Sequence, residues 1–321
     1  MADERLKQTS FMTRLMRRPE LGAVSGLVLV SIFFYILASD RMFTLSGILT
    51  FMSPAAQLGI LAIGAALLMV GGEFDLSVGS MVAFAGLIFG ASVTALHLPL
   101  LPAILLTLAM AAAFGTLNGQ IVLRTGLPSF IVTLAFLFIL RGLTLVGLKW
   151  ATGGSTQMRG IREAVGDSVL APLFSGQALE GLFAWLAGQG MIETFASGLP
   201  KVTGIPVDIL WFFGIAAVAT IVLTLTRVGN WIFSRRRRRQ AARNSGVPVA
   251  RVKTVLFIVT ARCAALVAIL TVMDTGSTDA GAAFRRSSRR SSPRSSAAAC
   301  SPAATARRSA PSSGRSSSAW C

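Results

Sequence analysis

Long apolar blocks alternate with short polar stretches from residue 21 to residue 273. A helix that crosses a bilayer needs roughly 20 mostly apolar residues. Seven blocks meet this requirement and predict membrane spans at 21–39, 47–71, 77–96, 99–122, 128–148, 208–226 and 253–273. The pattern therefore predicts an all-α fold, a multi-span transmembrane helical bundle over residues 21–273 that follows a polar, basic N-terminal segment at 1–20.

Two of the polar connections differ from the others. The connection at 149–207 is long, and GLFAWLAGQGMIETFA (181–196) within it has the composition of an amphipathic helix that lies in the membrane interface. The connection at 72–76 is short and acidic. It is either a loop at the membrane edge or a break in a helix inside the membrane, so the number of spans depends on it.

Small residues recur inside the apolar blocks. In lipid, small side chains let helix backbones approach closely and associate through van der Waals contact. A tightly packed bundle is therefore expected around these glycines: Gly64, Gly79, Gly86, Gly90, Gly115 and Gly119.

The positions of Lys and Arg predict the orientation of the bundle. Cytoplasmic connections of membrane proteins carry an excess of these residues. Basic residues crowd the N-terminal segment, and the connection at 227–252 contains an arginine run at 235–239. Alternating spans place both segments on one side, so we expect a multi-pass protein with a cytoplasmic N-terminus.

The amino-acid composition argues against several classes of function. The chain has 321 residues, of which 53% are hydrophobic and 13% charged, and its net charge of +17 arises mostly outside the apolar blocks. It contains one histidine, His97, and three cysteines without the spacing of a metal site. It also lacks a GxxxxGK[ST] phosphate loop. We therefore expect neither an enzyme nor a metal or cofactor bound by this chain.

The stretch GGEFDLSVGSMVAFAG (71–86) carries the first informative motif. Gly71 and Gly72 break one helix, and Asp75 or Ser77 can accept hydrogen bonds from the free N–H groups that begin the next. One interpretation is a capped helix start at the membrane edge. The other is a broken helix beside a polar pathway, where carboxylates mark a substrate or gating region.

Two further motifs follow. In RTGLPSFIVTLAFLFILRGL (124–143), Pro128 suits the first turn of a helix, and Arg141 lies late in the predicted span. We expect Arg141 to snorkel to the interface or to form a structural pair, in preference to binding substrate. The segment AARNSGVPVARVKTVLF (241–257) predicts a basic cytoplasmic loop with a short helix able to dock into a partner's groove.

Together the three motifs resemble those of the permease subunit of bacterial ribose-type ABC importers, the carbohydrate uptake transporter-2 family. The resemblance extends over about residues 20–273. The matching residues of the first two motifs are Gly71, Gly72, Asp75, Leu76, Ser77, Val78, Gly79, Ser80, Gly126, Leu127, Pro128, Phe130, Ile131, Val132, Thr133, Leu134, Arg141 and Gly142. Those of the third are Ala241, Ala242, Arg243, Gly246 and Val247.

The resemblance implies a monosaccharide permease in the bacterial inner membrane. Its partners would be a second permease copy, identical or related, separate ATPase subunits that bind ATP, an extracytoplasmic sugar-binding protein, and the surrounding membrane lipid. Ala241, Ala242, Arg243, Gly246 and Val247 would form the loop that couples the permease to the ATPase. The substrate path would be lined or braced by Gly72, Glu73, Asp75, Ser77, Gly79 and Thr133.

Three alternatives stay open. The first is a permease for branched-chain amino acids or nucleosides. The second is an ion-coupled secondary transporter, which would need ionisable residues inside several spans. The third is a membrane protein with a basic, nucleic-acid-binding tail. The sequence departs from the family in two places: SRRRRRQ (234–240) replaces the usual Gly-Gly-Asn/Asp, and the last family spans are missing.

The tail at 274–321 contains no Leu, Ile or Val and is rich in Arg, Ser and Ala. When TCN serine codons are read two bases further on, TC fills the last two positions of the new codon, which then encodes Phe, Leu, Ile or Val. An apolar, glycine-rich segment like the missing one would result. We therefore expect a frameshift near Phe284, a disordered tail and a chain that is inactive as translated. A smaller, compensated shift would account for the arginine run at 235–239. A genuine basic extension would account for the tail without any frameshift.

Overall fold

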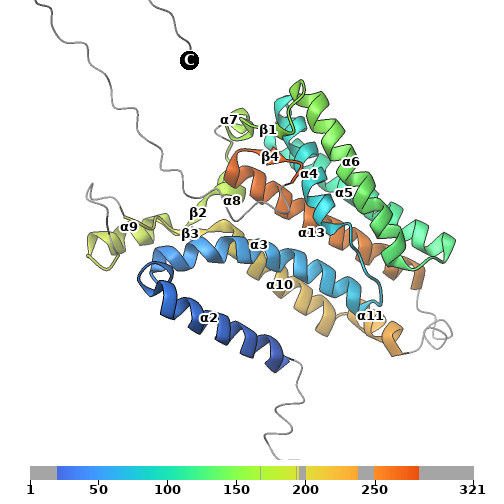
Figure 1. Ribbon diagram of the computed structural model, residues 1–321, viewed down its shortest axis with the longest axis horizontal. Helices are drawn as coiled ribbons and strands as arrows, with labels where there is room; N and C mark the ends of the chain where they lie inside the picture. Colours follow the sequence, from blue (N-terminus) through green and yellow to red (C-terminus); the bar gives the residue numbers. More distant parts are fainter. Residues whose placement is uncertain (1–19, 167, 193, 195–199, 238–248, 282–321) are drawn as a thin grey trace, which may run out of the picture. The chain divides into compact units, whose positions relative to one another are not determined.

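The computed structural model describes residues 20–281 apart from 167, 193, 195–199 and 238–248. These residues form a helical bundle (Figure 1). The long helices are α2 (Glu20–Met42), α3 (Leu45–Val70), α4 (Val78–Thr94), α5 (Leu100–Thr125), α6 (Ser129–Thr152), α10 (Val207–Leu225) and α13 (Val249–Thr275). The short helices are α7 (Ile161–Val165), α8 (Pro172–Ser175), α9 (Glu180–Gly188) and α11 (Arg227–Arg237). The all-α prediction is confirmed.

Every predicted span is a helix, but one of them is short. Six of the helices, all of the long ones except α4, are long and apolar enough to cross a membrane. Helix α4 has 17 residues and is therefore about 25 Å long, against a hydrocarbon core of about 30 Å. Most of its side chains are buried by neighbouring helices. The prediction of a full span at 77–96 is thus corrected to a short, enclosed helix, because α4 begins at Val78 and already ends at Thr94.

Helix α13 forms the centre of the bundle. It packs against α3, α4 and α5 (Figure 1), and small side chains allow the close contact, as predicted. A Cβ atom added to Gly115 of α5 would lie 2.8 Å from the Cα atom of Ile258. The hydroxyl of Thr260 donates a hydrogen bond to the backbone oxygen of Gly64 at 3.1 Å. A buried alanine row on α13 completes this packing: Ala261, Ala264, Ala265 and Ala268.

Consecutive long helices from α3 to α6 alternate in direction, so the connections divide between two ends of the bundle. One end holds residues 71–77 and the beginning of α13. The opposite end holds residues 153–206, where β1 (Gln157–Met158) pairs with β4 (Thr278–Asp279) and β2 (Gln177–Ala178) pairs with β3 (Ile205–Pro206), both antiparallel.

Several predicted boundaries differ from the structure. The amphipathic helix predicted at 181–196 is the shorter α9, Glu180–Gly188. Helix α13 continues to Thr275, and β4 follows it, so the folded part extends past residue 273 to the last described residue. The rest of the tail, and the loop residues 241–247, lie outside the described residues.

Candidate functional site: the break between two helices

The connection at 71–77 is held by polar side chains at the start of α6. The backbone N–H of Phe74 donates to the hydroxyl of Ser129 at 2.9 Å, and that of Leu76 donates to the hydroxyl of Thr133 at 3.1 Å. Backbone N–H groups that lie away from water and have no partner within a helix need another hydrogen-bond acceptor. Here the hydroxyl oxygens of Ser129 and Thr133 supply it. The fold therefore brings together the first two sequence motifs, which are more than 50 residues apart, and places Thr133 beside the helix break.

Asp75 caps the beginning of α4. Its Oδ1 atom accepts from the backbone N–H of Ser77 at 2.7 Å and from the Ser77 hydroxyl at 2.6 Å. Burial raises the pKa of Asp75, and these two hydrogen bonds from Ser77 oppose that rise. Of the two residues expected to cap the helix, Asp75 does so, whereas the side chain of Ser77 makes no such bond. Ser77 instead accepts from Asn118 at 3.3 Å.

Glu73 forms a buried ion pair with Lys253 of α13. The Oε1 to Nζ distance is 2.8 Å, and both side chains are nearly excluded from solvent. Removing two charges from water is costly, so such a pair persists only where each charge compensates the other. The pair ties the helix break to the helix that follows the predicted coupling loop. Sequence reasoning singled out Glu73 but not its partner.

The remaining predicted residues divide into two groups. Gly72 turns the chain out of α3 with a φ of +78°, a conformation that favours glycine, and Gly79 lies in the first turn of α4. The predicted coupling residues, Ala241, Ala242, Arg243, Gly246 and Val247, lie outside the described residues. The first two motifs thus form one structural unit with Asn118 and Lys253.

A second polar cluster, at the opposite end, escaped the sequence analysis. Asp208, in the first turn of α10, accepts from the Ser53 hydroxyl at 2.7 Å and from the side-chain amide of Gln57. The hydroxyl of Thr271 on α13 donates to the side-chain oxygen of Gln57 at 3.3 Å. The cluster joins α3, α10 and α13. A Gln in the middle of an apolar block was the signal that could have revealed it.

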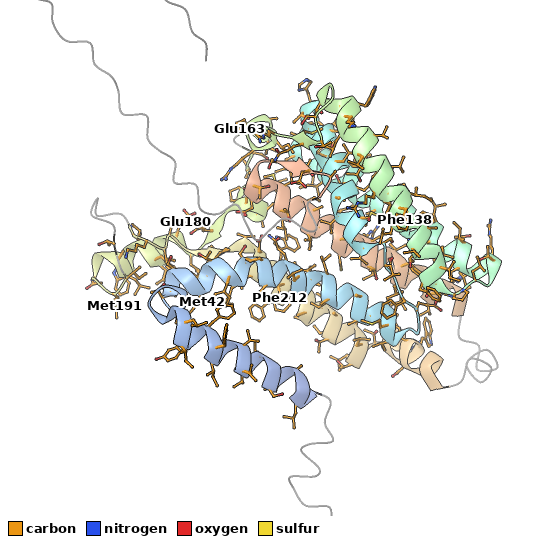
Figure 2. The ribbon with its side chains drawn as sticks, in the orientation of Figure 1. Met42, Phe138, Glu163, Glu180, Met191 and Phe212 are labelled. Atoms are coloured by element: carbon orange, nitrogen blue, oxygen red, sulfur yellow. The ribbon has the colours of Figure 1, made fainter. Side chains whose placement is uncertain are left out.

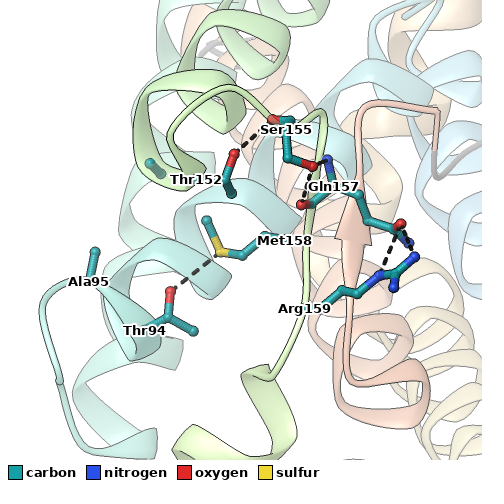
Figure 3. A pocket seen from close by; sticks show the side chains of 8 residues that line it. Thr94, Ala95, Thr152, Ser155, Gln157, Met158 and Arg159 are labelled. Carbon is teal, nitrogen blue, oxygen red and sulfur yellow. Dashed lines mark hydrogen bonds between the residues drawn. The ribbon is translucent and has the colours of Figure 1, made fainter.

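A polar pocket of about 530 Å³ also lies at that end, between the last residues of α4 and α6 and strand β1. Figure 3 shows hydrogen bonds that join Ser155 to Thr152 and to Gln157, and a further hydrogen bond from Arg159 to Gln157. The guanidinium of Arg159 is therefore held by the side-chain oxygen of Gln157. Among the described residues, no group of three His, Cys, Asp or Glu side chains could hold a metal ion.

Comparison with known proteins identifies the family. A sequence profile described as "Branched-chain amino acid transport system / permease component" matches residues 47–285. The xylose/arabinose import permease of Sulfolobus acidocaldarius is 28% identical over 276 residues, which cover 83% of this chain and 66% of that protein. The ribose import permease of Escherichia coli K12 is 27% identical, with 82% and 71% covered.

An autoinducer 2 import permease of Yersinia enterocolitica is 27% identical over 266 residues, which cover 82% of this chain and 71% of that protein. The chain therefore spans only about two thirds of the length of these relatives. No solved structure matches it. The profile covers well over half of the chain, and in the described part of the chain six helices are long and apolar enough to cross a membrane. The chain is an integral membrane protein that belongs to the branched-chain amino acid transport system / permease component family.

Proposed function

We propose that this chain is the membrane-spanning subunit through which an ABC importer moves a monosaccharide into the cell. The observation that carries the proposal is the identity of its relatives. The relatives from Sulfolobus and Escherichia import xylose, arabinose or ribose, and each aligns with more than four fifths of this chain. These substrates are all pentoses, so a pentose is the first substrate to test.

The geometry around the helix break supports a transport role. ATP hydrolysis on a partner has to move helices that are themselves inside the membrane. The Glu73–Lys253 pair links the start of α13 to residues 71–77, and Ser129 and Thr133 link those residues to α6. We propose that Ala241, Ala242, Arg243, Gly246 and Val247 dock on an ATPase subunit, and that this chain of contacts transmits the movement.

The proposal includes the remaining partners and the orientation. A second permease copy and an extracytoplasmic sugar-binding protein complete the importer, and ATP is bound by the ATPase alone. The N-terminus and the 71–77 end face the cytoplasm. The arginine run at 235–239 supports this orientation, because it follows α10 at that end.

A second candidate substrate class is a branched-chain amino acid. The description of the matching family favours it. Both classes use the same architecture, so only a transport measurement with competing substrates separates them.

We further propose that the reading frame changes near Phe284. The family match ends at residue 285, and after Phe284 the sequence changes to Arg, Ser and Ala. The residues after Phe284 contain no apolar block long enough to cross a membrane, and we propose that the chain with this tail is inactive.

The test uses cells that lack their own pentose permeases and express any ATPase and binding-protein genes found beside this gene. One strain carries the present chain, and the other carries a version with the frame restored near codon 284. We expect labelled ribose to enter only the second strain and unlabelled xylose to compete. Competition by leucine alone would establish the amino-acid class, and entry of neither substrate in the restored strain would refute the proposal.

A further inference from the structure

Arg141 stands at the centre of a membrane-spanning helix and faces outward. It is the thirteenth of the 24 residues of α6. The position is central because the helix continues to Thr152, beyond its predicted end at 148. Its side chain is exposed. The face around it is apolar: Phe138, labelled in Figure 2, is 63% exposed, and Leu145 is 39% exposed.

Lipid is an unsuitable neighbour for this charge. An arginine at the bilayer centre costs about 3 kcal/mol or more, and such residues almost always face a bundle interior or a water-filled cavity. Helix α6 is about 36 Å long, and an α6 centred in a hydrocarbon core about 30 Å thick places Arg141 about 15 Å from either edge. Its side chain is shorter than that distance. A snorkelling side chain would therefore not reach either interface from a centred helix.

A carboxylate partner is also missing at this depth. Arg141 makes no hydrogen bond or ion pair with any part of the chain that the structure describes. Acidic residues in the described spanning helices stand no more than two residues from a helix end: Glu20, Asp40, Asp208 and Asp274. A second copy of this chain would therefore bring none of these carboxylates to the middle of α6. Among the described residues and a second copy of them, only water or a neutral acceptor is left to satisfy the guanidinium.

We propose that the exposed face of α6 forms a wall of the translocation path, where Arg141 and Phe138 contact the passing monosaccharide. This inference rests on the proposed function. A guanidinium offers five N–H donors, which suit the clustered hydroxyl oxygens of a sugar. Phe138 lies one helical turn away on the same face, and its ring can cover the apolar C–H face of a sugar. A Cβ atom on Gly142 would meet nothing within 4 Å, so the surface beside Arg141 is open.

The experiment measures the reaction of single cysteines in native membranes. Cys300 and Cys321 are first replaced by serine, and the buried Cys263 is retained. The test variants are Arg141→Cys and Phe138→Cys. The control is Leu58→Cys, since Leu58 is 67% exposed and is the fourteenth of the 26 residues of α3, at a similar depth. A charged methanethiosulfonate reports access from water, and a lipid-soluble maleimide shows that each variant is present and folded.

We expect Arg141→Cys and Phe138→Cys to react with the charged reagent at least tenfold faster than Leu58→Cys. When the same variants are placed in the frame-restored chain, saturating ribose or xylose should slow both reactions severalfold, and leucine should not. If Arg141→Cys fails to fold, Phe138→Cys carries the same test.

Four results would overturn the inference. Reaction as slow as that of Leu58→Cys would mean that the face meets lipid. Spontaneous disulfide cross-linking of Arg141→Cys, with no reaction in water, would mean that a second copy covers it. Fast reaction that no pentose slows would remove the sugar contact while leaving the proposed function intact, because that function is decided by uptake. Protection by leucine alone would overturn both proposals.

Discussion

At the scale of single residues, the pair of Glu73 and Lys253 has the clearest consequence. Both charges are buried and 2.8 Å apart, so each compensates the other. Removing one partner of a buried pair leaves an uncompensated charge, which typically costs about 3–5 kcal/mol.

We therefore expect Glu73→Gln and Lys253→Met each to lower the unfolding temperature of the detergent-solubilised protein strongly. The exchange of both, Glu73→Lys with Lys253→Glu, should recover part of the loss. Glu180→Gln, at an exposed position on α9, serves as the control and should change little. If the double exchange were no more stable than the single variants, the two side chains would not act as a pair.

Asp75 gives the protein a pH dependence. Burial raises its pKa in the folded state, so the folded protein binds a proton more readily than the unfolded chain does. The contribution of Asp75 to stability is therefore lowest when the carboxylate is charged, and it improves as the pH falls through the raised pKa. Asp75→Asn removes the charge and keeps an oxygen that can accept from Ser77.

We expect Asp75→Asn to be at least as stable as the parent at neutral pH, and the difference to shrink as the pH falls towards 4. Thermal unfolding at several pH values measures it. Asp75→Ala, which loses the acceptor, should be less stable at every pH. A parent protein that loses its advantage over Asp75→Ala only at acidic pH would indicate a lowered pKa and contradict this account.

At the scale of elements, the contact between α5 and α13 depends on the absence of side chains. A Cβ atom on Gly115 would lie 2.8 Å from backbone atoms of Phe257 and Ile258. These atoms cannot move away by a change of rotamer, as a flexible side chain can. Overpacking of this kind typically costs about 1–3 kcal/mol.

Gly115→Ala should therefore lower the unfolding temperature. The matched control is Gly214→Ala on α10, where a Cβ atom would meet nothing within 4 Å. Alanine is favoured over glycine inside a helix by about 1 kcal/mol, so the control should be neutral or slightly stabilising. Equal effects of the two substitutions would show that α5 and α13 do not touch as described.

Sequence periodicity predicts the helices well and their contacts poorly. Runs of apolar residues located all of the long helices, and glycines indicated close packing, because both signals are local. Hydropathy predicted the start of α4 to within one residue but placed its end at 96 and not at Thr94. It did not reveal the hydrogen-bond acceptors from α6 that hold this start, because they are distant in sequence. Lys253 and Asp208 were missed as site residues for the same reason. Glu73 lies 180 residues from Lys253, and Gln57 lies 151 residues from Asp208. Arg141 was found, but its depth depended on the true end of α6.

At the scale of the whole molecule, the chain combines a permease bundle with a C-terminal segment that the bundle's family does not share. The family match ends at residue 285. We propose that a restored frame continues the bundle, and that neither the ATPase nor the binding protein can drive transport through the chain with its present tail. The ion-coupled alternative makes a different prediction, because its energy source is a gradient and not ATP.

Uptake of labelled pentose into proteoliposomes shows whether this chain belongs to an ATP-driven importer. The frame-restored chain is reconstituted with the ATPase, the binding protein is added outside, and the lumen contains either ATP or a non-hydrolysable analogue. We predict uptake only with ATP and only with the binding protein present. Uptake driven by a proton or sodium gradient, without ATP, would contradict the account.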